Sequence, residues 1–120
     1  MKSKKYDLDE RLIDFAVANI KLVESLPKTR SAIHLGGQLL RSGTSPSLNY
    51  GEAKSGESKN DFIHKVSIVL KELRETQINL KLLSGSIKET QHLQMESCQN
   101  ECGQLVAIFH KTVITAKSKK

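Results

Sequence analysis

The sequence predicts an all-α protein that folds as an up-down-up-down antiparallel four-helix bundle with a kinked second helix. Apolar residues recur at alternating steps of three and four along four segments of the 120-residue chain, which is typical of amphipathic helices. No segment shows the strict alternation or the turn dipeptides of a β-hairpin. A chain of this length forms one domain. We expect the bundle at residues 8–116, between basic flexible ends at residues 1–7 and 117–120.

The first helix is expected at residues 8–26. Asp7 followed by Glu10 resembles a capping box in carboxylate form, and Pro27 ends the periodic segment. The apolar stripe consists of Leu8, Leu12, Phe15, Asn19, Leu22 and Leu26. A second line makes this face wide enough to contact more than one neighbour, and it consists of Ile13, Ala16, Ile20 and Val23.

The second helix begins near Thr29, and small residues occupy half of its stripe. The stripe consists of Ile33, Gly36, Leu40, Gly43, Ser47 and Tyr50. Because a helical glycine costs up to about 1 kcal/mol relative to alanine, Gly36 and Gly43 predict a close approach by a neighbouring helix or a local break. Pro46 removes a helical hydrogen bond and predicts one long helix kinked near residues 43–46. Two short helices around a loop at residues 42–47 are the alternative.

The third helix opens at Ser58, where Asp61 three residues later completes a capping box. Its stripe consists of Phe62, Val66, Val69, Leu73, Thr76, Leu80, Leu83 and Ile87. Ile78 and Leu82 fall about 160° from this stripe, and Ile68 also lies off the core face. The helix therefore predicts a second contact surface in addition to the core.

The fourth helix follows Gly85, which punctuates the chain. Its stripe consists of Met95, Cys98, Cys102, Leu105, Phe109, Thr112 and Ala116, with Val106 and Val113 alongside. Cys98 and Cys102 occupy consecutive core positions, where a free cysteine packs as a small hydrophobe. The chain has four histidines, but their spacing brings no three metal ligands together, so we expect no metal site.

The chain contains no nucleophile motif, phosphate-binding loop or dinucleotide fingerprint. Glu72 and Glu75 alternate with Lys71 and Arg74, which is the pattern of an exposed, ion-paired helix face rather than of paired catalytic carboxylates. We therefore expect no enzymatic activity and no cofactor. The longest apolar run, residues 105–109, is far shorter than the ~20 residues of a membrane span, so we expect no membrane association and a cytoplasmic protein.

The formal net charge of +6 is concentrated at the two ends of the chain. The basic residues between the ends are balanced by 13 acidic ones, so the body is formally neutral. The six end lysines are Lys2, Lys4, Lys5, Lys117, Lys119 and Lys120. They are the first candidates for contacts with the phosphates of RNA or DNA, and the next candidates on the bundle are Arg30, Arg41 and Lys54. Solvated ends without a ligand are the alternative.

Several short stretches together resemble a known family. They are Gln38–Arg41 leading into Asn49, Tyr50 and Glu52, then Asp61 and Phe62, the segment Lys71–Glu75, and last Glu101 and Cys102. Over about residues 8–116 the chain resembles the four-helix bundle proteins related to those encoded in bacterial 23S ribosomal RNA intervening sequences. The resemblance implies a homopentamer. It also extends to an accessory protein of diversity-generating retroelements, a basic pentamer that binds nucleic acid and its reverse transcriptase.

Two function classes follow from these observations. The first is a homo-oligomer, with five copies as the expected number, that associates with RNA or DNA. The second is a structural module that binds another protein and has no nucleic-acid role. In either class, Ile68, Ile78 and Leu82 are the expected apolar interface residues. Arg41 and Glu52 match polar positions of the family but lie about 16 Å apart along one helix, so we expect them to form contacts between helices or between subunits.

Overall fold

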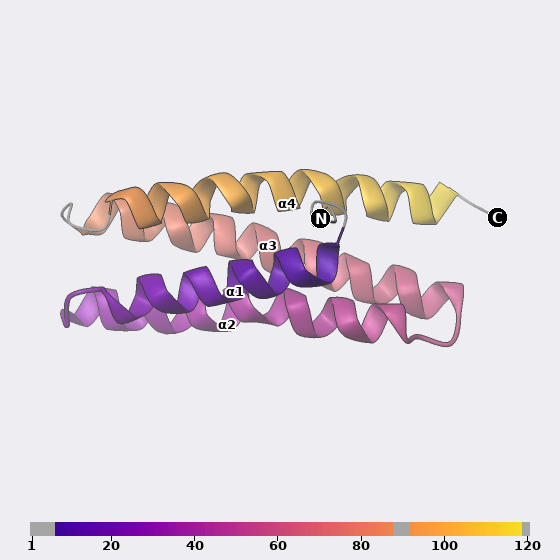
Figure 1. Cartoon of the computed structure of the whole chain (residues 1–120), viewed down its shortest axis with the longest axis horizontal. Coiled ribbons are helices and arrows are strands. Elements are labelled where there is room, and N and C mark those ends of the chain that lie inside the picture. Colours follow the sequence, from indigo (N-terminus) through magenta and orange to yellow (C-terminus); the bar gives the residue numbers. More distant parts are fainter. Residues whose placement is uncertain (1–6, 88–91, 119–120) are drawn as a thin grey trace, which may run out of the picture.

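A computed structural model of the protein describes residues 7–87 and 92–118, and this part of the chain is helical with short connections. Its helices are α1 (Leu8–Glu24), α2 (Arg30–Lys54), α3 (Lys59–Ser86) and α4 (His92–Ser118). Successive helices run in opposite directions and lie side by side (Figure 1). The contact between α2 and α3 is the most extensive, and that between α1 and α4 is the smallest of the main ones. The all-α four-helix bundle is thus confirmed.

Capping side chains set the beginnings of the first three helices. Asp7, Thr29 and Ser58 each accept a hydrogen bond from the backbone N–H three residues later, at 3.2, 3.2 and 3.0 Å. Each bond satisfies one of the amides that a helix start leaves without an intrahelical partner. The N-cap hydrogen bonds expected at Asp7 and Ser58 are therefore confirmed, and the reciprocal bonds that would complete the two capping boxes stay a prediction.

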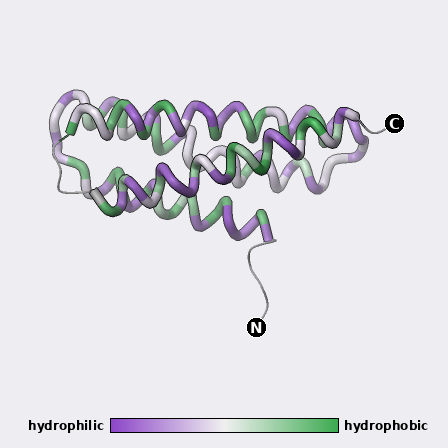
Figure 2. Tube along the Cα trace, turned by 90° about the horizontal axis from the view of Figure 1, so that it is seen from above, coloured by the Kyte–Doolittle hydropathy of each residue, from purple (hydrophilic) through white to green (hydrophobic). Residues whose placement is uncertain are grey.

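The core follows the expected stripes in α1, α3 and α4. Hydrophilic and hydrophobic stretches succeed one another along every helix (Figure 2). The largest fully buried side chains include Phe15 of α1, Leu73 and Leu80 of α3, and Leu105 and Phe109 of α4. All five belong to the periodic positions read from the sequence. The periodicity therefore identified the buried faces of these three helices.

Several buried positions of α2 are shifted by one residue from the expected stripe, since Ala32, Leu39 and Pro46 are buried in place of Ile33, Leu40 and Ser47. Its buried positions are Ala32, Gly36, Leu39, Ser42, Gly43, Pro46 and Ala53. Ile33, expected in the core, is 62% exposed. The two glycines face α1, because a Cβ atom at Gly36 would lie 3.2 Å from Val23 Cγ1, and one at Gly43 would lie 2.9 Å from Asn19 Nδ2. The expected close approach at both glycines is confirmed.

α2 continues through Pro46 without interruption, so the alternative of two short helices is wrong. Proline removes one backbone donor from the helix. Nearby hydroxyl groups supply donors to other carbonyls of this region: Thr44 Oγ1 donates to the Leu40 carbonyl at 2.6 Å, and Ser47 Oγ donates to the Thr44 carbonyl at 2.9 Å. The kink itself stays a prediction.

Three helix ends differ from the expected bounds. α1 ends at Glu24, where the Ser25 hydroxyl donates to the Leu22 carbonyl at 2.7 Å. α3 passes through Gly85 and ends at Ser86, so that glycine does not separate the helices. α4 extends to Ser118, which places Lys117 in its last turn rather than in a flexible end. The expected N-terminal tail, up to residue 6, lies outside the described residues.

α1 is much shorter than the other helices, with 17 residues against 25, 28 and 27 for α2, α3 and α4. α2, α3 and α4 continue past the start of α1 toward one end of the bundle (Figure 1). At that end a groove of about 640 Å³ opens between α3 and α4. Its lining is Lys59, Phe62, Ile108, Lys111, Thr112, Thr115 and Ala116.

Candidate functional site

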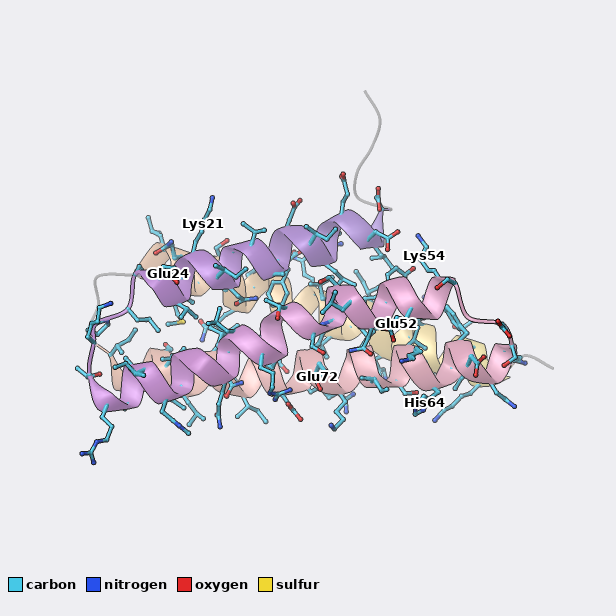
Figure 3. The ribbon with its side chains drawn as sticks, turned by 90° about the horizontal axis from the view of Figure 1, so that it is seen from below. Lys21, Glu24, Glu52, Lys54, His64 and Glu72 are labelled. Atoms are coloured by element: carbon cyan, nitrogen blue, oxygen red, sulfur yellow. The ribbon has the colours of Figure 1, made fainter. Side chains whose placement is uncertain are left out.

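Ion pairs connect α2 and α3 along their shared length. Arg41 binds Glu72 at 3.0 Å and Glu75 at 2.7 Å, and Glu52 binds Lys65 at 2.5 Å. Glu72 is only 8% exposed, so the expectation that it lies on the solvated face of α3 is wrong. It is turned toward α2, where Arg41 compensates its charge (Figure 3). Arg41 and Glu52 were expected to form contacts either between helices or between subunits. In the structure both residues form contacts between α2 and α3 of one chain.

The hydrogen bonds of Arg41 change the acidity of its partners. The pKa of Glu75 is lowered, mainly because its carboxylate accepts a hydrogen bond from Arg41. The pKa of Arg41 is raised by the hydrogen bonds to Glu75 and then Glu72. Arg41 is thus already ion-paired with two carboxylates of α3, and a phosphate would have to compete with them.

The candidate phosphate-binding residues that the structure describes do not form one patch. Arg30, Arg41 and Lys54 all lie on α2, but intervals of 11 and 13 residues separate them by about 16 and 20 Å along the helix axis. Lys54 forms an ion pair with Asp9 of α1, and its ammonium lies 5.7 Å from the ring centroid of Tyr50. Lys117 is exposed on α4. The remaining candidates lie outside the described residues, and they are Lys2, Lys4, Lys5, Lys119 and Lys120.

The two cysteines are buried core residues, as the spacing predicted. Burial raises the pKa of the Cys98 thiol to about 11 and that of Cys102 to about 12. Cys102 Sγ donates to the Leu73 carbonyl of α3 at 3.3 Å. Both groups are therefore protonated thiols near neutral pH and act as packing atoms. No group of three potential metal ligands comes together within residues 7–87 and 92–118.

Ile78 and Leu82 project outward from α3, with exposed fractions of 60% and 50%. Ile68, expected on the same surface, is half-buried. A shallow groove of about 400 Å³ lies beside Ile78 and is lined also by Ser67, Leu70, Lys71, Arg74 and Glu75. Ile78 and Leu82 thus lie off the core face as expected, with basic side chains next to them, and their contact with a partner stays a prediction.

α1 has an exposed apolar row that the sequence only partly indicated. Ile13 and Ile20 belong to the line expected to pack against a neighbouring helix, yet they are 52% and 38% exposed, and Val17 between them is 42% exposed. Only Ala16 and Val23 of that line turn inward. The spacing of Ile13, Val17 and Ile20 could have predicted this row, because residues at i, i+4 and i+7 share one helix face. The groove lined by Phe62 and Ile108 was also missed, although the shortness of the first helix pointed to it.

No helix in the part of the chain that the structure describes has the length and apolar content to cross a membrane.

Comparison with known proteins connects this bundle with one family. No curated protein matches the chain. A crystal structure of a protein of unknown function, from the S23 ribosomal protein family of Bacteroides thetaiotaomicron VPI-5482, matches with a TM-score of 0.78 and 32% sequence identity. The match covers 88% of this chain and 96% of that one. A family model described as 23S rRNA-intervening sequence protein matches residues 4–111. The chain therefore belongs to the 23S rRNA-intervening sequence protein family.

Proposed function

We propose that the protein is a non-enzymatic homo-oligomer, a pentamer of about 67 kDa, which is five times the 13.4 kDa of one chain. The observation that carries this proposal is the apolar surface of the isolated chain. Within residues 7–87 and 92–118, the exposed large hydrophobic residues are Ile13, Val17, Ile20, Ile33, Leu48, Ile78, Leu82, Leu93 and Ile114. Single exposed apolar residues are ordinary, but rows on one helix face favour burial against a partner.

The number of subunits rests on the resemblance noted from the sequence, which implies a homopentamer. Size-exclusion chromatography with light scattering tests self-association at micromolar concentrations. We expect one species well above the mass of a single chain. A species of 13.4 kDa throughout the concentration range would overturn the proposal.

Binding of RNA or DNA is a second candidate function, favoured by the charge at the end of α4. Glu101 is the last acidic residue of the chain, and four lysines follow it at positions 111, 117, 119 and 120. Five chains would bring their end lysines together on one particle, and linked weak sites gain about 10²- to 10⁴-fold in avidity. Such binding tolerates any sequence and weakens steeply with salt, because lysine contacts to phosphate carry no base information.

Gel shifts at two salt concentrations test this second function. We expect weak retention of RNA or DNA by the natural chain at low salt, and none near physiological ionic strength. A variant with the six end lysines replaced by glutamine loses the retention, whereas a control with Lys21→Gln and Lys28→Gln keeps it. If the six-lysine variant still binds, the surface lies on the bundle, where Arg30 is the first candidate. If the natural chain does not bind, this second candidate is rejected, and the alternative of a module that binds another protein takes its place.

A further inference from the structure

The exposed side of α1 combines apolar and acidic residues. At 100° per residue, Ile13, Val17 and Ile20 lie within about 60° of one another, and acidic side chains border them. The set comprises Ile13, Val17 and Ile20 with Glu10, Asp14 and Glu24, and we call it the α1 outer face. Lys21 is the basic exception and lies at its edge, pointing away from α2 (Figure 3). α1 as a whole has four acidic and two basic residues.

The exposed side of α3 has the opposite charge around a similar apolar centre. Its set comprises Ile78 and Leu82 with Lys71, Arg74 and Lys81, and we call it the α3 outer face. Glu75 is the acidic neighbour on this side, and its carboxylate is already held by Arg41 at 2.7 Å and lies 3.7 Å from Lys71. Arg74 lies 3.3 Å from His110 Nδ1 of α4. The groove of about 400 Å³ beside Ile78 gives this face a concave part.

We infer that the α1 outer face of one copy binds the α3 outer face of the next copy. This inference rests on the proposed homo-oligomer and names its interface. Each face has an apolar centre that association removes from water. The acidic border of α1 meets the basic border of α3, which favours this pairing over the contact of two identical faces, where like charges would meet.

The two faces differ, so the contact is heterologous, and such contacts produce rings when they close. Both faces border α2 in the same subunit. On the α1 side, Val23 packs at Gly36, and on the α3 side, Glu75 binds Arg41.

Two variants that each damage one face test this pairing. The first has Val17→Glu with Ile20→Glu, and the second has Ile78→Glu with Leu82→Glu. All four positions are exposed, so the bundle tolerates the charges, and helical circular dichroism checks this. Ile114→Glu is the matched control, because Ile114 is also exposed but lies on α4, outside both faces.

Light scattering on each protein and on their mixture separates the possible contacts. We expect the natural chain and the Ile114→Glu control to be large oligomers and each double variant to be a monomer. An equimolar mixture of the two double variants then forms a dimer of about 27 kDa, twice 13.4 kDa, and nothing larger, because only one intact pair of faces remains.

Other results overturn the inference. If both double variants keep the natural mass, the oligomer exists but uses other surfaces. If either variant alone forms a dimer, or if the mixture stays monomeric, the two faces do not bind each other. A monomeric natural chain instead rejects the proposed function itself, so the two failures are distinguishable.

Discussion

The close approach of α1 and α2 predicts that Gly43→Ala destabilises the protein, although alanine is the better helix former. A Cβ atom at Gly43 would lie 2.9 Å from Nδ2, 3.1 Å from Cγ and 3.2 Å from Cβ of Asn19. Asn19 cannot easily move, because it is fully buried and its Nδ2 donates to the Phe15 carbonyl at 2.9 Å. The added methyl group therefore forces the two helices apart or breaks this hydrogen bond.

Two opposing effects set the magnitude. Replacing a helical glycine by alanine gains up to about 1 kcal/mol of helix propensity. Overpacking a filled interior costs about 1–3 kcal/mol, so we expect Gly43→Ala to lower the free energy of unfolding by about 1 kcal/mol. Gly37→Ala is the matched control on the same helix, because nothing lies within 4 Å of its added Cβ atom. Gly37→Ala has the gain in helix propensity without the overpacking, so it raises the free energy of unfolding by about 0.5–1 kcal/mol.

Urea unfolding of the natural chain and both variants, at one subunit concentration, measures these differences. Asn19→Ala removes Nδ2 and Cγ, the two atoms nearest to the added Cβ, so Gly43→Ala added to that variant costs less than in the natural chain. If Gly43→Ala stabilises as much as Gly37→Ala, the two helices are not in contact at this glycine and the reasoning is refuted.

The remaining predictions concern the thiols and the Arg41 ion pairs. Cys98 and Cys102 should stay unreactive toward a thiol reagent at pH 8 in the folded protein and react once it unfolds, because burial raises their pKa to about 11 and about 12; fast reaction of the folded chain would show exposed thiols. Cys98→Ala with Cys102→Ala should lower the free energy of unfolding by a few kcal/mol and leave the zinc content unchanged in elemental analysis. Arg41→Gln should raise the pKa of Glu75, measured by NMR titration, toward the ordinary 4.5. Since that pKa is lowered in the folded state, the stabilisation is present above pH 4.5 and is lost as the pH falls through the folded-state value; an unchanged pKa in Arg41→Gln would contradict the assigned cause.

Periodicity predicted α1, α3 and α4 well because large apolar residues dominate their buried faces. Leu73 and Leu80, for example, are seven residues apart and both fully buried. α2 was harder, since all its buried positions except Leu39 are alanine, glycine, serine or proline, which carry a weak hydrophobic signal. The expected stripe therefore included the large Ile33, which is exposed, in place of the neighbouring Ala32, which is buried.

Hydrogen bonds and ion pairs between side chains of different helices could not be predicted from one sequence. In a buried polar layer, Ser42 Oγ accepts hydrogen bonds from Thr76 Oγ1 at 2.9 Å and from Asn79 Nδ2 at 3.0 Å. These residues are 34 and 37 positions apart in the sequence, and no spacing pattern predicts that they meet. For the same reason Glu72 was assigned to solvent, because its partner Arg41 lies on another helix. The outward residues Ile78 and Leu82 were predictable, since their angle to the core stripe depends on a single helix.

Native mass spectrometry of the full chain is the strictest test of the homopentamer, because it counts subunits without a shape assumption. We expect one dominant species of about 67 kDa, five copies of 13.4 kDa, at low micromolar concentration. A spectrum dominated by the 13.4 kDa monomer would mean that the outward apolar residues of α1 and α3 do not mediate assembly. A dominant dimer would show a self-complementary contact and contradict the ring of unlike faces.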